Sequence, residues 1–138
     1  MDLNYLAVVA CAVAAMGIGA LWYGPLFGKK WMVIVGATAT DEARRNEMQR
    51  GATKLYLVQF LLTLFQVWVL AYYIGGWTDV SGLEQALWIW AAFIIPVVAG
   101  TAMWNNDSAK ISWARFLIQG GYQLVIFVMF GLVLGLWR

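Results

Sequence analysis

The sequence predicts an all-α integral membrane protein, a single domain over residues 1–138 with four transmembrane helices in a bundle. Hydrophobic residues make up 63% of the chain and charged residues 12%, whereas soluble domains have about 45 to 50% and about 25%. The charged residues are too few to cover the surface of a domain of this size. Part of the apolar surface must therefore face lipid or another subunit. The apolar residues also form four segments, each long enough to cross a hydrocarbon core of about 30 Å as a helix. The predicted spans are 3–27, 55–75, 83–104 and 113–136.

Lysine and arginine predict how these spans are oriented. Of the lysines and arginines, only Arg138 lies on the side that holds the N-terminus, the second loop and the C-terminus. The first loop and the third connection hold all the others, which are Lys29, Lys30, Arg44, Arg45, Arg50, Lys54, Lys110 and Arg115. Because positive charge is retained on the cytoplasmic side, we expect both termini outside and loop 28–54 in the cytoplasm.

The end of the first span is predicted to be a sharp elbow at the headgroups. Pro25 cannot continue the helix ladder and favours extended geometry at Gly24, and Gly28 then permits a tight turn. The elbow is either a rigid structural turn or a grip for a lipid phosphate. Its candidate residues are Trp22, Tyr23, Pro25, Lys29, Lys30 and Trp31.

The rest of the first loop is predicted to be an interfacial, amphipathic helical segment. The apolar stretch 31–35 is too short to span and is expected to lie along the cytoplasmic interface. Thr40 is a plausible N-cap, followed by Asp41 and Glu42 in the first turn, where the helix dipole favours acidic groups. We expect this polar helix to run directly into the second span.

Several motifs resemble one bacterial membrane family. Segment 19–32 reads GALWYGPLFGKKWM, LAYY follows at 70–73, WNND at 104–107 precedes Trp113, and the last span runs from GGY at 120–122 to a glycine- and leucine-rich end. Over essentially the whole chain, this pattern resembles the family named domain of unknown function 1761 (DUF1761). The resemblance implies a small four-helix protein of the bacterial inner membrane, and it supplies no catalytic residues to carry over.

Polar residues inside the second and fourth spans lie at helical spacing on one face of each helix. An unpartnered polar group in lipid costs several kcal/mol at worst, so such faces contact protein or water. Both helices start from the cytoplasmic side, so these side chains should meet at similar depth, either as interhelical amide hydrogen bonds or as a shared ligand site or polar conduit. The face of the second span carries Tyr56, Gln59, Thr63, Gln66 and Tyr73, and that of the fourth Arg115, Gln119, Tyr122 and Gln123.

Small residues four positions apart predict close helix packing. They are Ala7, Cys11, Ala15 and Gly19 in the first span and Gly131 and Gly135 in the fourth. These faces could serve subunit contacts in a homo-oligomer. We interpret Cys11 as a small packing residue. Pro96 should kink the third span near Ala92, as a packing bend or as a hinge.

The composition excludes much catalytic chemistry. The sequence has no histidine and one cysteine, so it lacks the commonest general base and metal ligand, and no cofactor or metal is expected. Basic residues do not form a stripe with aromatics, which disfavours nucleic acid as a partner. A membrane enzyme would depend on Asn105, Asp107, Lys110 and Arg115, without a second nearby carboxylate. No Asp or Glu lies deep in a span, which disfavours a proton-driven antiporter.

The sequence therefore predicts a non-catalytic protein of the bacterial inner membrane. Its expected role is to bind or pass a small polar or amphipathic molecule, or a lipid, through the amide-lined region between the second and fourth spans. The alternative is a structural or regulatory membrane component that docks a partner or anionic lipid through its basic segment 40–54.

Overall fold

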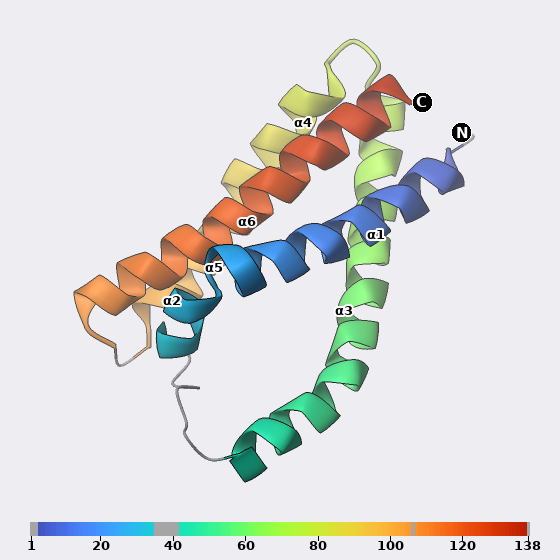
Figure 1. The fold of residues 1–138 in the computed structure, drawn as a ribbon. Helices are drawn as coiled ribbons and strands as arrows, with labels where there is room; N and C mark the ends of the chain where they lie inside the picture. The colour runs from blue at the N-terminus through green and yellow to red at the C-terminus, as the bar shows by residue number, and fades with distance from the viewer. Residues whose placement is uncertain (1–2, 35–41, 106, 138) are drawn as a thin grey trace.

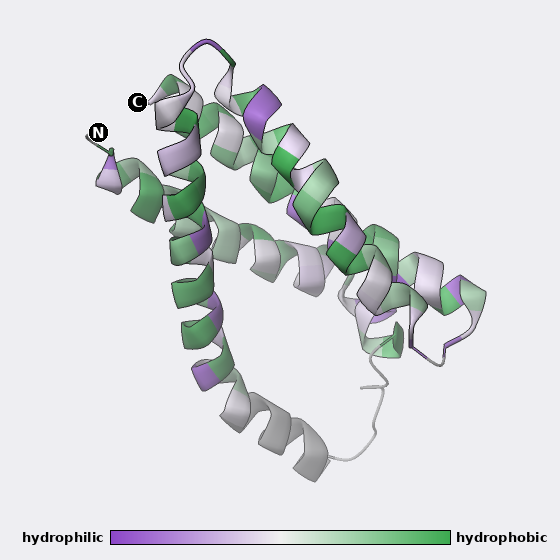
Figure 2. Ribbon diagram, turned by 180° about the vertical axis from the view of Figure 1, so that it is seen from behind, coloured by the Kyte–Doolittle hydropathy of each residue, from purple (hydrophilic) through white to green (hydrophobic). Residues whose placement is uncertain are grey.

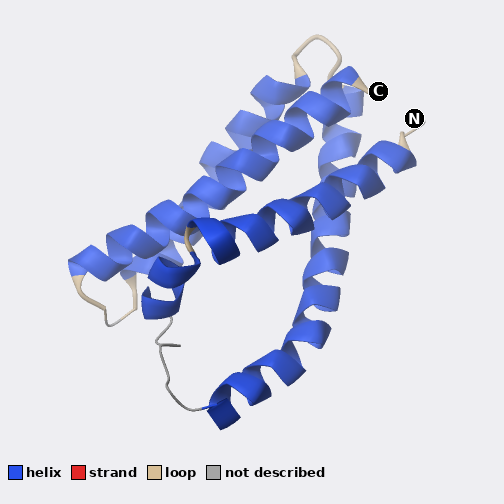
Figure 3. Ribbon diagram, in the orientation of Figure 1, coloured by secondary structure: helices blue, strands red, loops and turns tan. Residues whose placement is uncertain are grey.

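The computed structural model describes residues 3–34, 42–105 and 107–137, and within these ranges it is helical with no strand (Figure 3). The side chains of 42–50 are not described, and Thr40 and Asp41, the expected start of the polar helix, lie outside the described residues. The elements in chain order are α1 (Tyr5–Leu21), the π-helical turn η1 (Trp22–Leu26), α2 (Gly28–Ile34), α3 (Glu42–Gly76), α4 (Gly82–Ile89), the π-helical turn η2 (Trp90–Ile94), α5 (Ile95–Met103) and α6 (Ala109–Leu136) (Figure 1).

Four helical stretches are long and apolar enough to cross a membrane, which confirms the predicted class. They are Tyr5–Leu26, Gly51–Gly76, Gly82–Met103 and Ala109–Leu136. The second belongs to α3, a continuous helix of 35 residues. The polar segment after Glu42 therefore does run directly into the second span, as expected.

Hydrogen bonds at the helix starts fix the two ends of the bundle. Asn4, Ser81 and Ser108 each cap a helix by accepting from a backbone N–H three residues later. Asn4 Nδ2 also donates to the carbonyl oxygen of Trp137 at 2.9 Å, so both termini lie at one end, beside the α3–α4 connection (Figure 1). The opposite end holds α2 and the α5–α6 connection. We call it the basic end because it carries Lys29, Lys30, Lys54, Lys110 and Arg115.

Proline interrupts two of the spans by widening a helical turn. The expectation of extended geometry at Gly24 is wrong, because Gly24 and Pro25 both lie inside η1. The wider turn accommodates the missing N–H of proline, and the Phe27 N–H reaches the Trp22 carbonyl at 2.9 Å. The chain turns after Phe27, where a Cβ at Gly28 would lie 2.9 Å from the Tyr23 carbonyl oxygen. In the third span, η2 includes Ala92, where the sequence predicts the kink before Pro96.

The apolar core fills only the half of the bundle near the termini. It combines the first half of α1, the second halves of α3 and α6, and α4. Its largest fully buried side chains are Phe127, Phe130, Ile74, Val67 and Cys11. Toward the basic end α3 diverges from the other helices (Figure 1), and none of residues 51–62 is buried. The bundle is therefore closed at one end and open at the other.

Glycines bring α4 and α6 into backbone contact. A Cβ at Gly82 would lie 2.5 Å from the Gly131 carbonyl oxygen, and a Cβ at Gly131 would lie 2.8 Å from Ala86 Cβ. Ala7, Cys11 and Ala15 are buried in the core. These small residues pack against neighbouring helices of the same chain, as close helix packing requires.

Candidate functional site

A cavity of about 770 Å³ lies where the bundle opens, toward the basic end. Its walls come from the end of α1 with η1, from α3, from α5 and from the first half of α6. Its lining residues are Met16, Gly19, Ala20, Tyr23, Gly24, Tyr56, Gln59, Val97, Val98, Thr101, Gln119, Tyr122 and Gln123. We call this cavity the polar cleft. Its volume is typical of small-molecule sites, which span about 300 to 1,000 Å³.

On the α3 side, Tyr56 and Gln59 face the polar cleft. Gln59 Nε2 donates to Thr63 Oγ1 at 3.1 Å, so this amide is bonded within its own helix. Figure 2 shows hydrophilic positions recurring along α3 among apolar ones, as the predicted polar face requires. Thr63 is buried and Gln66 is half-buried, and neither lines the cleft.

On the α6 side, Gln119, Tyr122 and Gln123 share one face at helical spacing. The Tyr122 hydroxyl donates to the Ala15 carbonyl at 2.8 Å, which joins α6 to α1. Gln123 Oε1 is buried and accepts no hydrogen bond from the described residues. A buried acceptor left unfilled costs free energy, so Gln123 marks a point where a ligand or water donor is needed.

The amides of α3 and α6 share a cavity rather than bond to each other. Within the described part of the chain no hydrogen bond joins Gln59 to Gln119 or Gln123. Of the two arrangements expected from the sequence, direct interhelical bonds or a common cavity, the structure contains the second.

Two tryptophans hold the α1 and α5 sides of the site against α6. Trp22, the first residue of η1, donates its indole N–H to the Ile118 carbonyl at 2.9 Å. Trp90, the first residue of η2, donates likewise to the Gly120 carbonyl at 3.3 Å. The approach is close at Gly121, where a Cβ would lie 3.1 Å from the Trp22 ring. Both interrupted helices are therefore fixed to one turn of α6, beside Gln119–Gln123.

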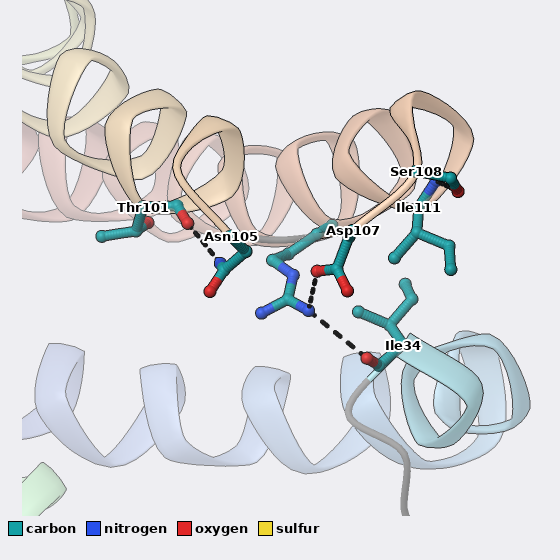
Figure 4. Close-up of polar contacts among 7 residues, drawn as sticks. Ile34, Thr101, Asn105, Asp107, Ser108 and Ile111 are labelled. Carbon is teal, nitrogen blue, oxygen red and sulfur yellow. Dashed lines mark hydrogen bonds and ion pairs between the residues drawn. The ribbon is translucent and has the colours of Figure 1, made fainter.

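At the basic end, Arg115 links neighbouring segments and does not line the cleft. Its Nη2 donates to Asp107 Oδ2 at 2.7 Å and to the Ile34 carbonyl at 3.3 Å, which joins α2 to the α5–α6 connection (Figure 4). Asn105 donates to the Thr101 carbonyl (Figure 4). These bonds hold α2 and the connection in place. The described residues contain no group of three His, Cys, Asp or Glu side chains able to hold a metal ion.

The elbow residues divide between the interior and the surface. Tyr23 lines the polar cleft and its ring packs against Trp31 at 4.9 Å and Tyr122 at 5.5 Å between centroids. Lys29 and Lys30 are exposed at the start of α2. Pro25 lies inside η1, and none of the five residues of η1 is buried.

Sequence reasoning missed the walls that α1 and α5 contribute. Met16, Ala20, Val97 and Val98 are apolar, so a search for polar faces does not find them. Thr101 offered a signal, because it is a polar residue in the half of the third span nearest the basic end. Its hydroxyl donates to the Val98 carbonyl at 2.9 Å.

Fold and site together define a multi-pass helical membrane protein with a polar cleft at the open end of its bundle. A family model described as "Protein of unknown function (DUF1761)" matches residues 6–135. The chain belongs to this family, as its motifs in segment 19–32 and beyond indicate. No curated protein and no solved structure matches the chain.

Proposed function

We propose that this protein binds a small polar or amphipathic molecule, or a lipid, in the polar cleft. The observation that carries the proposal is the cleft itself, which three amides and three phenols line from η1, α3 and α6. The buried Gln123 Oε1 has no hydrogen-bond partner among the described residues. Because an unpartnered amide group is costly in the apolar part of a membrane, the site gains stability when a ligand bonds there. The lining residues include no Asp, Glu, Lys or Arg, which favours binding over proton-coupled transport.

Native mass spectrometry of protein extracted gently from its own membrane tests this proposal. We expect a reproducible, stoichiometric extra mass on the wild-type chain. The double substitution Gln59→Leu/Gln119→Leu should reduce it strongly, because it removes an amide from each side of the cleft. The same spectrum reports the number of subunits.

Gln66→Leu is the matched control, because Gln66 lies on the polar face of α3 outside the cleft. It should keep the extra mass. Thermal unfolding in mild detergent is measured on all three proteins. An extra mass that is absent from wild type, or that persists unchanged in a folded double variant, would contradict the proposal.

The proposed setting is the bacterial inner membrane with the basic end in the cytoplasm and both termini outside. The charge distribution supports this orientation, because all described Lys and Arg lie toward one end of the bundle. In a Cys11→Ser background, Asp79→Cys should react with a membrane-impermeant thiol reagent in spheroplasts. Lys110→Cys should react only after permeabilisation. The reverse pattern would overturn the orientation.

A further inference from the structure

The polar cleft opens sideways, between α3 and α5. Tyr56 and Val97 both line it, yet they are 66% and 64% exposed. Since both belong to helices long and apolar enough to span a membrane, this opening faces the region that lipid fills. A ligand that enters from there has an apolar part, and Met16, Ala20, Val97 and Val98 provide an apolar wall for it.

No formal charge is available inside the cleft to balance a charged headgroup. The nearest guanidinium along α6, one turn before Gln119, belongs to Arg115, which does not line the cleft. Its Nη2 bonds to Asp107 and the Ile34 carbonyl, and its buried Nε has no partner among the described residues. Burying a phosphate or an ammonium group without a counter-charge is far more costly than burying a hydrogen-bonded neutral group. The chemistry of the lining therefore favours an uncharged polar group.

The hydrogen-bonding groups that remain require a partner that both donates and accepts. Gln59, Thr101 and Tyr122 have each used a donor inside the protein, on Thr63, Val98 and Ala15. Gln123 Oε1 is a buried acceptor without a donor among the described residues, and Gln119 brings a second α6 amide to the cleft. Hydroxyl groups meet both needs, whereas ester and ketone carbonyls only accept.

Resting on the proposed function, we infer that the ligand is an uncharged lipid whose headgroup carries several hydroxyl groups, such as a glycosyl diacylglycerol. Its headgroup lies among Gln59, Thr101, Gln119 and Gln123. Its chains leave between α3 and α5. The same hydroxyl chemistry occurs in free sugars, and the test below separates the two sources.

The test uses full-length protein in phosphatidylcholine nanodiscs, prepared without glycoside detergents because these carry the same headgroup chemistry. Glucosyl diacylglycerol, phosphatidylglycerol and phosphatidylethanolamine with identical acyl chains are titrated in competition and read by native mass spectrometry. We expect about tenfold preference for the glucosyl lipid, the scale of one or two satisfied hydrogen bonds. Because no charge is involved, the preference should not change between low and high salt.

Near-isosteric variants locate the bound headgroup. Gln123→Met and Thr101→Val should each remove most of the preference, whereas Gln66→Met should retain it. If the variants at 123 and 101 fail to fold, competition by free glucose against the wild-type complex is measured instead, and glucose should not displace the lipid.

The outcomes separate this inference from the proposed function. Salt-sensitive preference for phosphatidylglycerol would overturn the inference and leave a lipid-binding cleft. Displacement by free glucose would overturn the lipid assignment and keep the cleft as a sugar site. The protein could also retain each lipid only in proportion to its share of the nanodisc and show no effect of glucose. That result would overturn both the inference and the proposed function.

Discussion

At single residues, the tightest constraint in the bundle is the glycine contact between α4 and α6. Gly82 and Gly131 lie so close that neither position has space for a methyl group. Without a strong hydrophobic drive between helices in lipid, such close van der Waals packing is a main source of association. These two residues therefore determine how tightly the third and fourth spans pack.

Replacing either glycine by alanine should destabilise the bundle. In Gly131→Ala the new Cβ meets Gly82 O, Leu83 Cα and Ala86 Cβ, each at 2.8 Å, so backbone must move. Overpacking of this kind costs about 1 to 3 kcal/mol. Thermal unfolding in detergent should show a lower Tm for Gly131→Ala and Gly82→Ala.

Gly100→Ala is the control, because a Cβ there has no heavy atom within 4 Å. It should unfold at the wild-type temperature or slightly above it, since alanine favours helix more than glycine does. Equal Tm values for Gly131→Ala and Gly100→Ala would show that α4 and α6 are not in backbone contact.

Single residues also show what a sequence can predict about a site. The polar stripes on α3 and α6 predicted Gln59, Gln119, Tyr122 and Gln123, and the structure brings all four to one cleft. Helical spacing alone does not say which members of a stripe are used. Thr63 is buried outside the cleft, where it accepts a hydrogen bond from Gln59.

Among the elements, the two π-helical turns decide where the cleft lies. Each begins with a tryptophan whose indole N–H bonds to α6, at Ile118 and at Gly120. Residues within 16–24, just before and inside the first of these turns, and within 97–101, after the second, line the cleft. Proline thus does not end these helices but widens one turn, which is a common feature of functional sites in helical proteins.

The sequence predicted that proline alters both helices but not how. The steric clash between proline and the residue before it can be relieved in two ways. Gly24 can become extended, or the helical turn can widen and shift its hydrogen bonds by one residue. In the structure, Trp22 begins the wider turn and its indole N–H bonds to the Ile118 carbonyl of α6. That tertiary contact is not visible in the local sequence.

In the whole molecule, apolar packing and polar residues occupy different ends. The core near the termini buries Phe127, Phe130 and Ile74, whereas α3 diverges toward the basic end and leaves 51–62 unburied. The number of spans followed from hydropathy, because 20-residue apolar segments have few alternatives in a membrane. The divergence of α3 did not follow from hydropathy, because it depends on how α3 packs against three other helices at once.

The central claim is that the polar cleft holds a specific amphiphile, and photo-crosslinking tests it most directly. A photoreactive aromatic residue replaces Val97, which lines the cleft, or Phe93, which does not. These positions are similarly exposed, at 64% and 70%, so contact with bulk lipid is comparable. We predict a saturable crosslink to one lipid class from position 97 and non-selective labelling from position 93. The same unselective lipid mixture at both positions would contradict the account.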